Sequence, residues 1–177
     1  PRQVSRLGND GIYRVESAKL LATLTHTLPG MPYVYQGEEI GMTNVAYDTI
    51  EDYNDRYTVG SYYARVNAGE DPAQVLAQLR PISRDNARTP YQWDDSPNAG
   101  FTTGKPWLKV NPNYAQINAA EQLERADSVL NYYRRLIALR KREQVILDGS
   151  YEDILFDRED VYAYRRVSDD AVLTVAA

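Results

Sequence analysis

The sequence predicts an α/β fold that gives way to antiparallel β structure near the end of the chain. Apolar residues recur at helical spacing over residues 13–28, and a short apolar run follows at residues 31–36. A helix followed by a buried strand is half of a repeating β/α unit. From residue 151 onward the apolar period changes to two, which indicates β-strands.

The first part of the chain is interpreted as a loop, a helix and a buried strand. Residues 1–11 are polar and rich in Gly, Asn and Asp, which predicts a loop. The helix at residues 13–28 has Glu16 near its start and is ended by Pro29-Gly30. The apolar run at residues 31–36 lies between glycines, as expected of a short buried strand.

The middle of the chain combines two helical patterns with long polar segments. The helical patterns cover residues 50–67 and 72–79, and Asp71 is a candidate N-cap for the second of them. Residues 83–95 have no amphipathic period, so we expect a loop there. Residues 101–114 are interrupted by Gly and Pro and are expected to be irregular.

The strongest helical pattern covers residues 126–147, with Asp127 as its expected N-cap. Three runs of alternating apolar residues follow and predict antiparallel strands at 151–156, 161–167 and 171–175.

The change of period predicts a domain boundary near residue 148. Residues 1–147 are then one unit, and residues 148–177 begin a second, all-β unit. No internal repeat or low-complexity tract suggests a different division.

Composition excludes several classes of function. A net charge of −5 and a pI near 5.0 argue against nucleic acid or an anionic membrane as partner, because no basic patch is available to neutralise phosphates. No apolar run approaches the roughly 18 residues of a membrane span. Without cysteine the chain has neither disulfides nor thiolate ligands, which fits a cytoplasmic location.

Residues 83–95 carry the clearest chemical signal in the sequence. They combine two arginines, three aspartates, an asparagine, a glutamine and a tryptophan. Guanidinium and carboxylate groups bond sugar hydroxyls in pairs, and an aromatic ring stacks on the apolar face of a sugar. The alternative is a solvated charged loop that is braced by an ion pair or two.

The ordered motifs resemble one enzyme family over essentially the whole chain. Among them are Gly37-Glu38-Glu39 and Arg84-Asp85-Asn86, and the full set lies at residues 1–2, 5–10, 16–19, 35–44, 84–90, 93–95, 100–104 and 110–114. The chain resembles glycoside hydrolase family 13, the α-amylase family, in its oligo-1,6-glucosidase and α-glucosidase branch.

The resemblance implies the C-terminal part of a (β/α)8 TIM barrel followed by the start of an antiparallel β domain. The chain would supply the seventh barrel helix, the eighth strand, a long loop with extra helices, the eighth helix and the first strands of the β domain. A complete barrel needs about 250 residues.

The resemblance also places the family's three catalytic carboxylates upstream of Pro1. Retaining glycosidases need a nucleophile and an acid/base. The spacing of Glu38, Glu39, Asp85 and Asp94 does not suggest a replacement pair, so we expect no catalytic residue in this chain and no activity from it alone. No cofactor and no metal site is expected among its residues.

Five residues are predicted substrate contacts. Arg84 would bond the terminal glucose beside an upstream aspartate, or alternatively brace its loop. Arg2 could line the cleft, or alternatively form a buried structural ion pair. Glu38 could line the cleft at the end of the eighth strand, or alternatively anchor loop backbone. Arg56 and Tyr57 stand where many relatives have an acidic residue near the leaving group, so either could contact the leaving sugar.

Four further residues are predicted to brace the site. Arg88 is expected to tie its loop to the barrel, with Asp85 as a structural carboxylate beside it. Trp93 is interpreted as a packing residue of its loop, although a sugar platform is the alternative. Glu39 is expected to anchor backbone at the end of the eighth strand.

The function that the resemblance implies is hydrolysis of short α-glucosides from the non-reducing end, with an isomaltose-type sugar as substrate. A trehalose-6-phosphate hydrolase or a sucrose isomerase resembles this region nearly as well. A relative of another class, the heavy chain of an amino-acid transporter, keeps the barrel without its carboxylates. Oligomeric state is left open.

Overall fold

Helices dominate the computed structural model, which describes all of residues 1–177, and a small sheet closes it. The α-helices are α1 (Gln3–Leu7), α2 (Arg14–Thr27), α3 (Arg56–Asn67), α4 (Pro72–Leu79), α5 (Asp85–Arg88), α6 (Ala119–Glu124), α7 (Val129–Arg142) and α8 (Gln144–Asp148). Short 3-10 turns are η1 (Glu38–Ile40), η2 (Ile50–Asp52), η3 (Arg80–Ile82), η4 (Pro97–Gly100) and η5 (Pro112–Ala115). The strands are β1 (Ser150–Ile154), β2 (Ala163–Val167) and β3 (Val172–Ala176).

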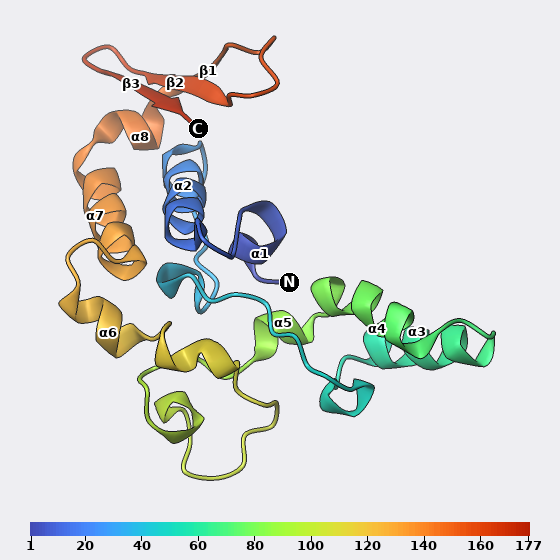
Figure 1. Ribbon diagram of the computed structural model, residues 1–177. Helices are drawn as coiled ribbons and strands as arrows, with labels where there is room; N and C mark the ends of the chain where they lie inside the picture. The colour runs from blue at the N-terminus through green and yellow to red at the C-terminus, as the bar shows by residue number, and fades with distance from the viewer.

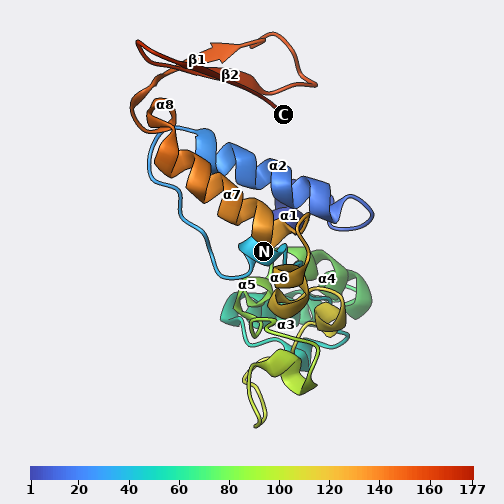
Figure 2. The same cartoon turned by 90° about the vertical axis from the view of Figure 1, so that its left-hand side faces the viewer.

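The sheet lies at one end of the molecule, above the paired helices α2 and α7 (Figure 1). Its strands run antiparallel in the order β1-β2-β3, and Val167 of β2 faces Ser150 of β1 and Val172 of β3. Figure 2 shows α2 and α7 side by side beneath the sheet, with the connections that carry α3 to α6 at the far end. The chain is therefore a mixed α/β segment that ends in a three-stranded antiparallel sheet, and the three predicted strands are confirmed.

The main core forms where α1, α2 and α7 meet. Its buried side chains are Val4, Ala18, Ala22, Val129, Tyr133 and Leu136. Their i, i+4 and i+3 spacing along α2 and α7 produces the apolar stripe that the sequence predicts. His26 belongs to the same region, since it is buried and meets the Tyr133 ring edge-on at 5.3 Å between centroids.

A second core lies beneath α3 and α4. It is built from Val45, Tyr47, Ile50, Tyr53 and Leu76, with the Tyr47 and Tyr53 rings 5.1 Å apart. The predicted cap of α4 is confirmed, because the Asp71 carboxylate accepts a hydrogen bond from the backbone N–H of Gln74 at 2.8 Å. This core supports the two connections that carry the candidate site.

Arg166 joins the sheet to the helices. It is 1% exposed, and it donates to the carbonyls of Thr27 at 3.0 Å, Ile146 at 2.8 Å and Gly149 at 2.6 Å. Two of these carbonyls are at the C-terminal ends of α2 and α8, where a cation also complements the helix dipole. Burial lowers the pKa of Arg166, with the charge of Arg140 acting in the same direction.

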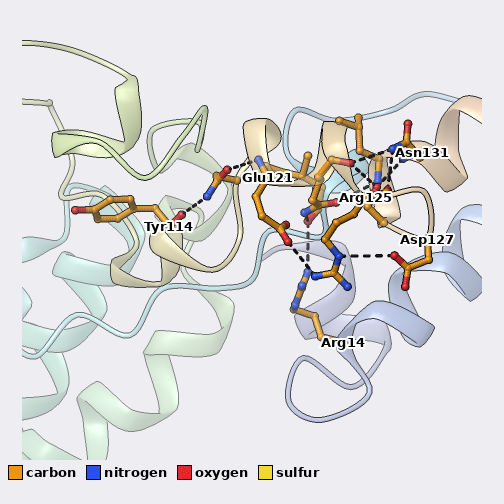
Figure 3. A network of polar contacts seen from close by, with 11 residues as sticks. Arg14, Tyr114, Glu121, Arg125, Asp127 and Asn131 are labelled. Carbon is orange, nitrogen blue, oxygen red and sulfur yellow. Dashed lines mark hydrogen bonds and ion pairs between the residues drawn. The ribbon is translucent and has the colours of Figure 1, made fainter.

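The turn between α6 and α7 is held by polar contacts (Figure 3). Arg125 pairs with Glu121 at 2.9 Å and with Asp127 at 3.6 Å. The side-chain amide of Asn131 donates to the carbonyl of Arg125 at 2.8 Å. Arg14 of α2 approaches the same region and donates to the carbonyl of Gly41 at 2.9 Å, so α2 is tied to the connection that follows η1.

The predicted strand at residues 31–36 is wrong. The segment is an irregular connection, and Met31 and Tyr33 are 78% and 83% exposed. A strand requires a neighbour that pairs with its backbone N–H and C=O groups. The only strands of this structure are β1, β2 and β3, which pair with one another and not with this segment.

The single helix predicted at residues 126–147 is two helices, α7 and α8. Glu143 between them is extended, with φ −95° and ψ 99°. The break allows α8 to bury Val145 and Ile146 near the sheet, so tertiary packing outweighs the continuous apolar period. Asp127 is not the cap, because the Ser128 hydroxyl accepts the N–H of Asn131 at 3.1 Å.

The expected loops contain more helix than the sequence suggests. Residues 1–11 include α1, residues 83–95 include α5, and α6 follows residues expected to be irregular. The helix expected at residues 50–67 begins only at Arg56, after η2 and an extended stretch. These helices are four to six residues long or interrupted, so their amphipathic signal is weak. No helix of the structure has the length and apolar character to cross a membrane.

We expect replacement of Arg166 by methionine to lower the free energy of unfolding by about 2–4 kcal/mol, because buried carbonyls lose their donor. Denaturant unfolding measures this. Arg165→Met is the matched control, since Arg165 is exposed on the neighbouring position of β2. Equal losses in the two variants would contradict the role of Arg166.

Candidate functional site

The polar centre of the site is an ion pair between Arg84 and Asp55. Arg84 lies directly before α5, and Asp55 lies directly before α3. Arg84 donates to Asp55 Oδ1 from Nε at 2.8 Å and from Nη2 at 2.5 Å. The backbone N–H of Arg84 donates to Asp55 Oδ2 at 3.3 Å, so one carboxylate fixes both the backbone and the side chain of the arginine.

The two partners differ in exposure. The Arg84 side chain is 59% exposed, whereas that of Asp55 is 1% exposed. Burial opposes the ionisation of Asp55, but hydrogen bonds from Arg84 and Thr58 outweigh it and hold its pKa at about 2. Thr58 contributes through its hydroxyl, which donates to Asp55 Oδ2 at 2.9 Å. Arg84 is therefore bonded to the buried Asp55 on one side and exposed to solvent on the other.

Asp85 is a second buried carboxylate next to this pair. Its side chain is fully buried, and its Oδ2 accepts the backbone N–H groups of Asn54 at 2.7 Å and Asp55 at 2.8 Å. Arg88 is 3.6 Å from Asp85 Oδ1, one turn along α5. Asp85, for which a structural role is predicted, is therefore buried between two loops rather than exposed on the surface.

Arg2 holds three connections together. It is 2% exposed and donates to the carbonyl of Asn86 at 2.9 Å, to the hydroxyl of Thr89 at 3.1 Å and to the carbonyl of Gln36. Burial lowers its pKa, and nearby acidic groups oppose that shift only in part. Every side-chain nitrogen of Arg2 has a protein acceptor, so bracing is the role that its geometry supports. No carboxylate is among these acceptors.

Glu38 and Glu39 lie in η1. Glu38 accepts the N–H of Tyr35 at 3.2 Å, and burial is the main reason that its pKa is raised. Glu39 accepts hydrogen bonds from the N–H of Gly37 at 2.8 Å and from the hydroxyl of Tyr91 at 2.7 Å. The second bond ties η1 to the segment at residues 83–95. Both glutamates anchor backbone, as one of the two interpretations of the sequence expects.

Gly37 is required where η1 begins. Its φ is +91°, and a Cβ there would lie 2.5 Å from the sulfur of Met42 and 2.8 Å from Nη1 of Arg2. A side chain would therefore collide with the buried group that braces the site.

Arg56 and Tyr57 begin α3, immediately after Asp55. Both are exposed, and the Tyr57 side chain is 61% exposed. Their position brings the predicted leaving-group contacts beside the Arg84–Asp55 pair. Trp93 is farther along the loop, 54% exposed, with its ring 4.5 Å from that of Tyr91. It packs against Tyr91 of its own loop and is otherwise open to solvent.

Asp55 is the site residue that the sequence analysis missed. The resemblance pointed to an aspartate upstream of Pro1 as the partner of Arg84, whereas the carboxylate bonded to Arg84 in this structure is Asp55. Its place before a helical pattern was a weak signal, because Asp is common at helix starts for capping alone.

The comparisons with known proteins agree with the motifs. The family description "Alpha amylase, catalytic domain" matches residues 1–149. An oligo-1,6-glucosidase from Parageobacillus thermoglucosidasius is 54% identical over 99% of this chain and 31% of its own length. The crystal structure of Bacillus licheniformis trehalose-6-phosphate hydrolase is 48% identical over 99% of this chain and 32% of that one, with a TM-score of 0.97.

A Klebsiella isomaltulose synthase also superimposes, at a TM-score of 0.92 and 42% identity over 99% of this chain and 32% of that one. The fold and the motifs define a segment of a glycoside hydrolase catalytic domain. The chain belongs to the α-amylase family, glycoside hydrolase family 13. It spans about a third of the length of the curated relatives that it matches.

We expect the Arg84–Asp55 pair to contribute stability that is lost in acid. The pKa of Asp55 is about 2 in the folded chain, against about 3.9 in an unfolded one. A depressed pKa gives stability that is fully present above about pH 4 and is lost as the pH falls toward 2. Asp55→Asn should therefore flatten the fall in unfolding free energy between pH 4 and 2. Identical slopes would contradict the assignment.

Proposed function

We propose that this chain is part of a retaining α-glucosidase of oligo-1,6-glucosidase type that hydrolyses short α-glucosides from the non-reducing end. One observation carries the proposal. Arg84 is held by a buried carboxylate through Nε and Nη2, while its Nη1 has no bond within the chain. A guanidinium anchored on one edge and open on the other suits the hydroxyls of a terminal glucose.

Neighbouring residues have different roles in this proposal. Glu38 uses one carboxylate oxygen to accept the backbone N–H of Tyr35, which leaves the other to accept a sugar hydroxyl. Arg56 and Tyr57 face the leaving sugar from the start of α3. Arg2 braces the site rather than binding sugar, because it is buried and each of its three side-chain nitrogens donates to a group of the chain.

The place of the chain in the whole fold is part of the same proposal. Residues 1–147 are the C-terminal portion of the catalytic barrel, and residues 148–177 are the start of the β domain. Helices α2 and α7 are then the seventh and eighth barrel helices. In a complete barrel, strands on both sides would supply the backbone partners that residues 31–36 lack here.

A trehalose-6-phosphate hydrolase or a sucrose isomerase is the second candidate. Trehalose-6-phosphate hydrolase from Escherichia coli is 46% identical over the whole chain, close to the value for several oligo-1,6-glucosidases. The shared segment therefore supports all three reactions nearly equally.

The proposal is tested with the complete reading frame that carries this chain, assayed on isomaltose, maltose, sucrose and trehalose 6-phosphate. We expect the highest kcat/KM for isomaltose, with glucose as product. Preference for trehalose 6-phosphate, or conversion of sucrose to an isomer, would select the second candidate. Residues 1–177 purified alone should release no p-nitrophenol from p-nitrophenyl α-glucoside, since the catalytic carboxylates are expected upstream.

Tyr57→Ala in the complete enzyme should change the ratio of kcat/KM between isomaltose and sucrose by about 3- to 10-fold, because an exposed aromatic contact to the leaving sugar is lost. Tyr63→Ala is a matched control, since Tyr63 is also exposed on α3 but lies farther along the helix. An unchanged ratio would exclude Tyr57 as a leaving-group contact.

A further inference from the structure

Two buried aspartates bond each other's loops in a reciprocal arrangement. Asp85, from the loop that carries Arg84, accepts the N–H groups of Asn54 and Asp55 at 2.7 and 2.8 Å. Asp55, from the other loop, accepts the backbone N–H and the guanidinium of Arg84. Each carboxylate thereby fixes the backbone from which the other projects.

The burial of these groups makes the arrangement costly unless its bonds are kept. Asp85 and Thr58 are fully buried, and Asp55 is 1% exposed. A buried carboxylate is stable only when hydrogen bonds or cations satisfy it. Asp85 Oδ1 has no hydrogen-bond partner, and its nearest cation is Arg88 at 3.6 Å. The Asp85 charge is therefore held mainly by the two N–H groups that precede α3.

We propose that Asp85 is a positioning residue for sugar binding. It does not reach the sugar itself. It holds Asn54 and Asp55 in one conformation, that conformation aims the Asp55 carboxylate, and the carboxylate directs Nη1 of Arg84 toward the terminal glucose. The proposal rests on the proposed function of Arg84, and it names the group that keeps the guanidinium oriented before substrate arrives.

The test is a double-mutant cycle in the complete enzyme, with Asp85→Asn, Arg84→Met and the double variant. Asparagine keeps the shape of Asp85 but loses the charge that the two N–H groups stabilise. We expect each single variant to raise KM for isomaltose by about 10- to 100-fold with a smaller change in kcat. In the Arg84→Met background, Asp85→Asn should change KM by less than about 2-fold.

Asp52→Asn is the matched control. Asp52 lies on the same connection, but its ion pair is with the exposed Lys109, so KM should stay unchanged. If Asp85→Asn fails to fold, Asp85→Glu replaces it in the cycle. Glutamate keeps the charge, but its longer side chain moves the carboxylate away from the N–H groups of Asn54 and Asp55.

The outcomes separate the two proposals. Unchanged KM in Arg84→Met overturns the proposed sugar contact, and the positioning role with it. A raised KM in Arg84→Met together with an unchanged KM in Asp85→Asn overturns only the positioning role. Fully additive effects in the double variant would show that Asp85 acts through general stability rather than through Arg84, and would also overturn it.

Discussion

Guanidinium groups that donate to backbone carbonyls are the interaction on which the rest of this structure depends. Arg166 binds the ends of α2 and α8 to the sheet, Arg140 donates to the carbonyl of His26 at 2.8 Å, and Arg2 joins three connections near the site. Most of this chain is helix and irregular connection, so many buried carbonyls have no ladder partner. An arginine offers five donors in one plane, which satisfies several such carbonyls at once.

The candidate site uses the opposite chemistry on the same scaffold. Carboxylates of Asp55 and Asp85 accept backbone N–H groups, and the guanidinium that Asp55 binds is exposed rather than buried. Arg2 is buried and each of its side-chain nitrogens already donates to the protein, whereas Arg84 is exposed and keeps one edge free. This contrast between engaged and open arginines is the physical basis for assigning one of them to structure and the other to sugar.

Relatives with different reactions share this segment at similar identity, among them an oligo-1,6-glucosidase and a trehalose-6-phosphate hydrolase. We propose that the shared segment serves the step that these reactions have in common, which is the binding of a terminal glucose. Differences between the reactions would then depend on exposed side chains at the rim, where Arg56 and Tyr57 lie. Such side chains can change without disturbing the buried hydrogen bonds of Asp55 and Asp85.

The sequence by itself determined the family, the helices α2 and α4 and the three terminal strands, and it drew attention to the residues around Arg84. Helical and alternating periods are local properties, and the motifs keep their order along the chain, so both can be read without coordinates. It did not determine that residues 31–36 lack strand partners, that Glu143 separates α7 from α8, or that Asp55 anchors Arg84. Those features depend on groups far apart in sequence, because a hydrogen bond between residues 55 and 84 exists only once the two loops have been brought together.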